Sequence, residues 1–269
     1  MSLRCRDLVL LGVCAALAAH ADARTLRVCA DPDNLPFSHQ DRSGFENRIA
    51  EVVARSMQAE LQYYWWPQRR GFLRNTLNAN VCDVVIGLPA GMDAVRTTQP
   101  YYRSTYVLVQ RDDRPPIAAL DDVRLRSMII GLVLPGDDGA ATPPAEDLAR
   151  RGIVDNVRGY TPFGEPTVAQ RIVDDVADRR IDVGILWGPQ AGFFSQRDGR
   201  NLVVVPVRTG TTAPLSVEFD IAMGVRRDDA ALRTELDAAI ERERGAIDAV
   251  LRDFAVPRAE PPARLAAPR

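Results

Sequence analysis

The sequence contains no lysine, and it has only two histidines and four cysteines in 269 residues. All 34 basic residues are therefore arginines, and they are mixed along the chain with 36 acidic residues to give a net charge of −2. This mixing argues against binding to nucleic acid or to an anionic membrane surface. A chain of this length can bury a real core in one large or two modest domains.

Patterns typical of metal sites and of nucleophilic catalysis are also missing. His39 is the single histidine beyond the N-terminal segment, so a histidine-based metal site is not expected. Asp31-Pro-Asp33 begins like a calcium loop, but the positions that need a ligand, Gly and Glu hold Leu35, Pro36 and Arg42. There is no G-x-S-x-G motif. The sequence therefore predicts a protein that is not an enzyme and that holds no metal or cofactor.

Residues 1–23 have the pattern of a secretory signal peptide. Arg4 and Arg6 precede an apolar segment over 8–19, and an A-x-A cleavage site follows at 21–23. The apolar segment is too short to span a bilayer. We therefore expect export, with cleavage after Ala23.

Export changes the interpretation of the cysteines. Only Cys29 and Cys82 remain after cleavage, and a lone pair in an oxidising compartment favours a disulfide. The alternative is that the two side chains are small buried hydrophobes.

The order of the expected elements is typical of an α/β fold. Apolar, β-branched or aromatic segments predict strands, and apolar residues at helical spacing predict helices between them. The strands are expected at 26–29, 61–66, 83–88, 101–110, 128–134, 154–160, 181–187, 202–207 and 217–225, and the main helices at 44–57, 142–152, 168–176 and 232–254, the last with a possible break at Gly245. This order predicts two lobes with a hinged cleft between them. The first lobe is expected at 24–110 plus 209–256, the second at 111–208, and a disordered Pro/Ala/Arg tail at 257–269.

The loop after the first strand is the strongest candidate for a binding site. It leaves the carboxyl end of that strand and enters the first long helix, which is where open α/β sheets bind ligands. Ser43 and Glu46 have the spacing of a capping box, so we expect Glu46 to cap the helix rather than to bind a ligand.

Nine sequence blocks resemble the type II periplasmic solute-binding proteins, and within them the MxaJ/XoxJ group of accessory proteins of quinoprotein dehydrogenases. These blocks cover nearly the whole chain after the signal segment and lie at 26–38, 44–50, 66–72, 82–87, 98–106, 136–140, 142–144, 150–159 and 187–189. The resemblance implies a two-lobed type II fold, with ligands held between the first-strand loop and the opposite lobe. By the same resemblance, the cleft would be lined by Asp31, Asn34, Phe37, Arg69, Arg70, Phe72, Gly136, Asp137, Asp138, Gly139, Thr142 and Trp187.

The chain departs from this family at two positions that matter for the ligand. Amino-acid-binding members carry a T-x-E-R-like segment after the third strand, whose arginine grips the ligand carboxylate, but residues 88–100 lack it. They also carry an acid for the ligand amine, and Trp187 stands at the matching position. These departures argue against an ordinary amino acid as the ligand.

Some of these residues also have simpler interpretations. Arg69 and Arg70 could form a solvated pair, the Gly136–Gly139 segment could be a simple turn, and the aromatic segment at 61–66 could pack in the core.

Three functions follow from the resemblance and the composition. The leading hypothesis is a non-enzymatic periplasmic accessory protein of a PQQ-dependent alcohol (methanol-type) dehydrogenase, with a cleft for a small ligand or a partner segment. The second is a receptor that delivers a small polar or anionic solute to an ABC permease. The third is a dehydratase-like enzyme, for which no acid/base pair stands out.

Overall fold

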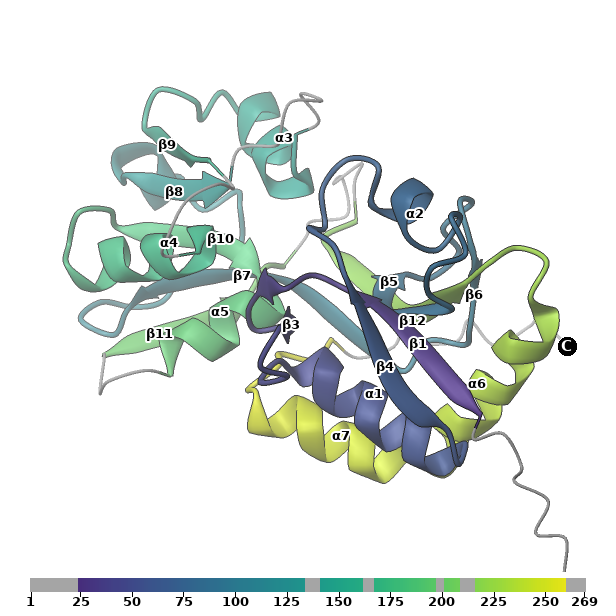
Figure 1. Cartoon of the computed structure of the whole chain (residues 1–269). Coiled ribbons are helices and arrows are strands. Elements are labelled where there is room, and N and C mark those ends of the chain that lie inside the picture. Colours follow the sequence, from purple (N-terminus) through teal and green to yellow (C-terminus); the bar gives the residue numbers. More distant parts are fainter. Residues whose placement is uncertain (1–23, 134–140, 162–166, 197–200, 209–215, 260–269) are drawn as a thin grey trace, which may run out of the picture.

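The structure is a computed structural model that describes residues 24–133, 141–161, 167–196, 201–208 and 216–259. Residues 1–23, the expected signal segment, lie outside the described residues. Figure 1 shows two α/β bodies connected by long strands, which confirms the predicted α/β class and the two lobes. In the part of the chain that the structure describes, we find no helix with the length and hydrophobicity of a membrane span.

The first lobe is built on a parallel core of strands. β1 (Thr25–Ala30) lies between β4 (Glu60–Trp65) and β5 (Val84–Pro89), parallel to both. β12 (Glu218–Val225) pairs antiparallel with β5, and the two-residue β6 (Arg96–Thr97) pairs with β12. A small hairpin of β2 (Asp33–Asn34) and β3 (Ser38–His39) sits in the loop after β1.

The strand β7 (Tyr102–Arg111) belongs to both lobes. Its first residues, Tyr102–Thr105, pair with β12, and residues from Tyr106 onward pair with β10 (Val183–Trp187) and β11 (Leu202–Pro206). β8 (Ile130–Val133) lies parallel to β10, and β9 (Val157–Tyr160) lies parallel to β8. The strand partners therefore change within β7, and the predicted residue boundaries of the lobes stay predictions.

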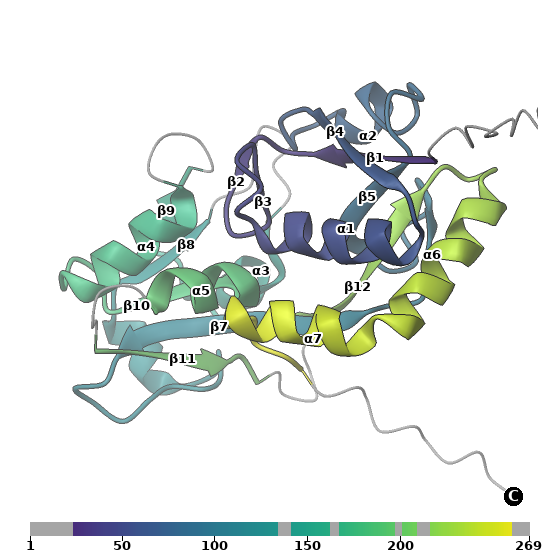
Figure 2. The same cartoon turned by 60° about the horizontal axis from the view of Figure 1, so that its bottom comes forward.

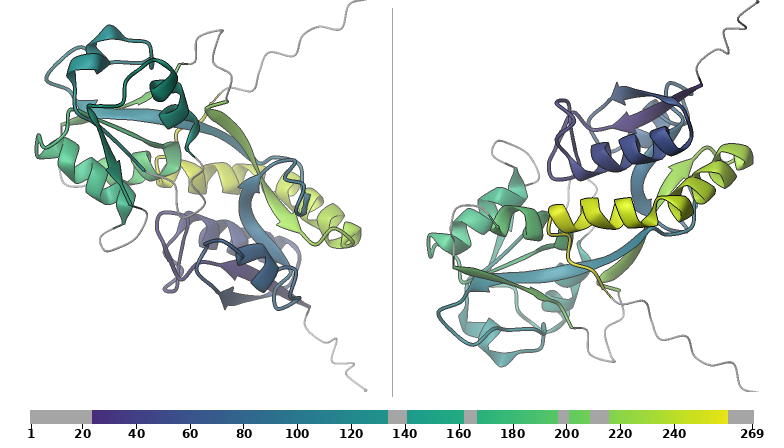
Figure 3. Two further views of the ribbon diagram at one scale, coloured as in Figure 1. Left: turned by 90° about the horizontal axis from the view of Figure 1, so that it is seen from above. Right: turned by 90° about the horizontal axis from the view of Figure 1, so that it is seen from below.

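Helices cover the faces of these sheets. In the first lobe, α1 (Phe45–Ser56) packs against α6 (Ala230–Arg242) and α7 (Arg244–Asp253), as the view from below in Figure 3 shows. In the second lobe, α4 (Val168–Ala177) and α5 (Gly188–Ser195) pack on β7 and β10. The shorter elements are α2 (Phe72–Asn75), the 3₁₀ helix η1 (Val123–Ser127) and α3 (Pro143–Arg150), which begins after Thr142 as its N-cap, with proline in its first turn, as predicted.

The last described residues connect the two lobes. In Figure 2, α7 ends beside α5. A Cβ atom added to Gly192 of α5 would overlap the carbonyl of Ala255, so the two segments are in close backbone contact. Ser104 Oγ donates to the carbonyl of Pro257 at 2.6 Å. Ala259 N donates to the carbonyl of Arg103 at 3.1 Å. The disordered tail expected at 257–269 stays a prediction. Residues 260–269 lie outside the described part of the chain.

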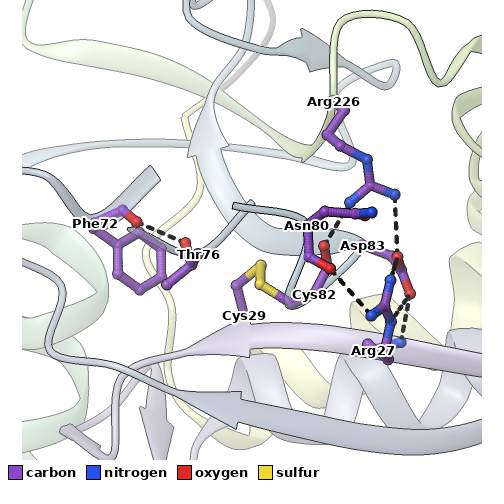
Figure 4. Close-up of a disulfide and its surroundings, with 8 residues drawn as sticks. All are labelled: Arg27, Cys29, Phe72, Thr76, Asn80, Cys82, Asp83 and Arg226. Carbon is purple, nitrogen blue, oxygen red and sulfur yellow. Dashed lines mark hydrogen bonds and ion pairs between the residues drawn. A yellow bond between two sulfur atoms is a disulfide. The ribbon is translucent and has the colours of Figure 1, made fainter. Parts of the chain in front are cut away.

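The predicted disulfide between Cys29 and Cys82 is confirmed. The Cα atoms of the two cysteines are 5.4 Å apart. Cys29 lies in β1, and Cys82 lies two residues before the start of β5. Figure 4 shows the bridge beside the ion-pair cluster of Asp83. Phe72 and Leu77 pack around the two cysteines in a small buried core. The disulfide therefore fixes the start of β5 to the strand that leads into the opening loop.

Candidate functional site

A cavity of about 440 Å³ lies where the carboxyl ends of β5 and β10 face the hairpin after β1. Strands β7 and β12, which connect the lobes, contribute to its walls. The position agrees with the general location of ligand sites in open α/β sheets. The lining residues are Asn34, Phe37, Glu46, Gln68, Gly87, Leu88, Pro89, Tyr102, Tyr106, Trp187, Gln190, Phe219 and Ile221.

Glu46 is the only carboxylic acid among these lining residues. It lies in the first turn of α1, where the helix dipole on its own would lower the pKa of a carboxyl group. Burial is the larger effect and raises the pKa of Glu46 to about 8. At neutral pH the cavity therefore holds a mostly protonated acid that can donate a hydrogen bond.

The predicted capping role of Glu46 is wrong. The helix begins after Gly44, and Asn47 Oδ1 accepts hydrogen bonds from the backbone N–H groups of Gly44 and His39 at 3.2 and 3.0 Å. The Glu46 N–H donates to the carbonyl of Phe37 at 2.9 Å. Since Asn47 and the hairpin provide the cap, the Glu46 carboxyl group is available to the cavity.

Gly87 provides the space for this carboxyl group. It lies in β5 within an otherwise apolar run, and a Cβ atom added there would overlap Glu46 Oε1. A glycine inside a strand often marks such a close approach. The sequence analysis did not single out Glu46 as a lining residue, and the glycine within the apolar strand is the signal that could have indicated a side chain placed against β5.

Aromatic rings form a second group in the cavity lining. Trp187 contacts Tyr106 and Phe219 with ring centroids 5.4 and 5.8 Å apart, each pair inclined by 66°. Phe37 and Tyr102 add two more rings from the first lobe. Tyrosines 102 and 106 are buried enough that the pKa of each phenol is raised, so both are neutral donors.

The hairpin after β1 is held in place by Asp31. Its Oδ2 accepts from the backbone N–H of Gln68 at 2.5 Å, and its Oδ1 accepts from that of Asp33 at 2.9 Å. Asn34 Nδ2 in turn donates to Gln68 Oε1 at 3.1 Å. Asp31 thus orients the wall of the cavity without being one of the lining residues.

The structure brings together only some of the side chains that the sequence predicts for the cleft. Asn34, Phe37 and Trp187 line the cavity. Phe72 instead packs in the buried core around the disulfide. Thr142 lies at the start of α3 and is not one of the lining residues. Gly136, Asp137, Asp138 and Gly139 lie outside the described residues.

Arg69 and Arg70 are exposed and are not among the residues that line the cavity. No basic side chain is found among the lining residues that the structure describes. An anionic ligand would therefore be buried here without a counter-charge, which is unfavourable. The described residues also contain no group of three or more His, Cys, Asp or Glu side chains that could hold a metal ion.

Comparisons with known proteins show what the whole chain is similar to. A MoxJ protein of Methylorubrum extorquens is 38% identical over 257 residues, which are 90% of this chain and 84% of that protein. A MoxJ protein of Paracoccus denitrificans is 28% identical over 254 residues, covering 90% of this chain and 92% of that protein. The crystal structure of the periplasmic binding protein XoxJ from Methylobacterium extorquens matches with a TM-score of 0.74 at 38% identity, covering 88% of this chain and 100% of that one.

The sequence profile of the bacterial extracellular solute-binding proteins, family 3, matches residues 26–251. This match runs from the second residue of β1 to near the end of α7 and so includes described strands of both lobes. The resemblance inferred from the sequence blocks is thereby confirmed. The chain belongs to the bacterial extracellular solute-binding proteins, family 3.

Proposed function

We propose that this chain is a non-enzymatic periplasmic accessory protein of a PQQ-dependent alcohol dehydrogenase, and that it aids activation or maturation of that enzyme. The observation that carries the proposal is the similarity to MoxJ and XoxJ proteins over nearly the whole chain at 38% identity. The cleft is the part of the molecule that would hold a small ligand or a segment of the partner.

The chemistry of the cavity supports this role over that of an amino-acid receptor. An α-carboxylate needs a cation or a set of hydrogen-bond donors to replace its water, and an arginine fork is the strongest such group. The described lining residues include no arginine. The polar side chains of the cavity include neutral amides, two phenols and the acid Glu46. Such side chains suit a ligand that is neutral or positively charged.

The test is a periplasmic capture experiment with the chain and a candidate dehydrogenase expressed together. The tagged protein should retain the dehydrogenase, and deletion of the accessory gene should lower dehydrogenase activity until the gene is restored. A dehydrogenase that is not retained and is fully active without the gene would contradict the proposal.

A transport receptor is the second candidate, and the cavity itself favours it. A volume of about 440 Å³ lies in the size range of small-molecule sites. This function predicts that a solute taken up by an adjacent permease raises the melting temperature of the protein, while capture of a dehydrogenase fails. The pair of measurements separates the two functions.

A further inference from the structure

The charge of the cavity restricts the ligands that it can accept. Glu46 and two tyrosines are the titratable groups among the described lining residues, and none of them is a cation. A ligand carboxylate or phosphate would meet a carboxyl group and neutral amides. A ligand cation would instead meet a carboxyl group that becomes its counter-charge on losing a proton.

The aromatic lining favours the same kind of ligand. Five rings line the cavity, contributed by Phe37, Tyr102, Tyr106, Trp187 and Phe219. Aromatic faces attract ammonium ions through their quadrupole, and tryptophan attracts them most strongly. Five rings and a single acid in one cavity, with no basic side chain among the described lining residues, are a combination suited to an alkylated ammonium group.

We propose that the cleft binds a small organic ammonium ion that carries no carboxylate, with Glu46 as the counter-ion and the ring faces of the cavity around its alkyl groups. This inference rests on the proposed use of the cleft as a binding site and names the class of its ligand. The space that Gly87 leaves beside the Glu46 carboxyl group fixes the position of the charge.

Binding of such a cation is coupled to the protonation of Glu46. Three described tyrosines interact electrostatically with Glu46. They are Tyr63 of β4, Tyr102 of β7 and Tyr101, which directly precedes β7. Burial raises the pKa of all three phenols, that of Tyr63 to about 12, so they stay neutral where Glu46 titrates. Among the lining residues that the structure describes, Glu46 is therefore the one that gains or loses a proton near pH 8, and the cation binds to its ionised form.

The experiment uses three probes of similar shape and different charge, measured by isothermal titration calorimetry on the full mature chain. Tetramethylammonium is the cation, neopentanol is the neutral probe and pivalate is the anion. Because tetramethylammonium does not titrate, any change of its affinity with pH reports on the protein. We expect its affinity to be roughly 90-fold higher at pH 9 than at pH 6, from a single group with a pKa of about 8.

The substitution Glu46→Gln should remove this pH dependence and weaken tetramethylammonium binding at pH 9 at least ~10-fold, while leaving neopentanol binding within about threefold. Glu46→Asp should restore the pH dependence. Glu51→Gln, on the same helix but outside the cavity lining, is the matched control and should behave as the unmodified protein. Circular dichroism on each variant establishes that it is folded.

The inference is overturned if pivalate binds more tightly than tetramethylammonium, if the affinity of the cation does not change with pH, if Glu46→Gln binds it as well as the unmodified chain, or if no cation binds at all. Failure of these measurements together with successful capture of the dehydrogenase would refute the ligand class alone. Cation binding without capture would refute the accessory role alone.

Discussion

Two partly or fully buried carboxyl groups of the first lobe, Asp83 and Glu46, have opposite electrostatic environments. Asp83 Oδ1 accepts from Arg27 Nη2 at 2.6 Å and from Arg226 Nη2 at 3.1 Å, and its Oδ2 accepts from Arg27 Nε at 2.9 Å (Figure 4). Burial alone would raise the pKa of Asp83, but the hydrogen bonds from the two arginines outweigh it and lower the pKa. For Glu46, burial is the dominant effect and raises the pKa to about 8.

The difference separates a structural role from a binding role. The two arginines compensate the charge of Asp83 within the protein, so this group ties β1, β5 and the end of β12 together. The Glu46 carboxyl group lies beside a cavity whose described lining residues include no cation. A buried carboxyl group without a cationic partner is stable only when it is protonated or when it binds a cation. Glu46 is therefore a candidate functional group.

The largest effect is expected from removing the disulfide next to Asp83. Replacing Cys29 and Cys82 with alanine opens a loop with a sequence separation of 53 residues. The chain-entropy estimate for a loop of this size is about 4 kcal/mol of lost stability. Urea unfolding of the variant against the oxidised protein measures it, and an unchanged midpoint would show that the bridge does not stabilise this region.

Breaking the Asp83 cluster should cost less than the disulfide but more than any change in the cavity. Asp83→Asn removes the charged acceptor that Arg27 and Arg226 share and leaves Arg226 with its longer contact to Asp229 at 3.4 Å. From the loss of two charge-assisted interactions we expect about 3 kcal/mol of destabilisation. The exposed Asp228→Asn is the control. Because the pKa of Asp83 is lowered by folding, its contribution is present at neutral pH and is lost as the pH falls through the folded value. If Asp83→Asn were as stable as Asp228→Asn, the proposed structural role of Asp83 would be contradicted.

Glu46 should show the opposite dependence on pH. The pKa of Glu46 in the folded state is about 8, above the ordinary value of 4.5. At a pH between these two values, the carboxyl group is protonated in the folded state and ionised in the unfolded state. Stability due to this group is present below pH 4.5 and falls as the pH rises, by about 2 kcal/mol between pH 5 and pH 7. Glu46→Gln should lack this fall in chemical denaturation curves. A fall of equal size in the variant would assign it to another group.

The smallest effect is expected at Arg70, which belongs neither to the ion-pair cluster of Asp83 nor to the lining of the cavity beside Glu46. Its side chain is exposed and is not one of the cavity-lining residues, so Arg70→Ala should change stability by less than about 0.5 kcal/mol. Tetramethylammonium binding should also be unchanged. If Arg70→Ala lost binding, Arg70 would have to be counted again among the binding residues, as the family resemblance predicts.

The regular elements could be predicted from the sequence because their signals are local. The apolar strand of β5 and the helical spacing of α1 lead to the observed elements within a residue or two at each end. The disulfide followed from the cysteine count and the expected export. The predicted single C-terminal helix is interrupted at Glu243, close to the possible break predicted at Gly245.

The cavity could not be predicted to the same degree because it depends on contacts between distant segments. Ser43 and Glu46 fit a capping box by spacing, but Gly44 packs so closely on the backbone of Phe37 and Ser38 that the helix begins after Gly44 and uses Asn47. Tyr106 and Phe219 come from different strands that only the sheet register brings together. Spacing along the chain does not contain this information.

The close contact between Gly192 and Ala255 has a practical consequence for work on this protein. A chain shortened to end at Phe254 would lose the backbone group against which α5 packs, as well as the carbonyl of Pro257 that Ser104 binds. The lobes would then share fewer connections besides β7 and β12. Affinity tags and fusion partners for the capture and calorimetry experiments should therefore be joined beyond Ala259, so that the last described hydrogen bond to Arg103 is kept.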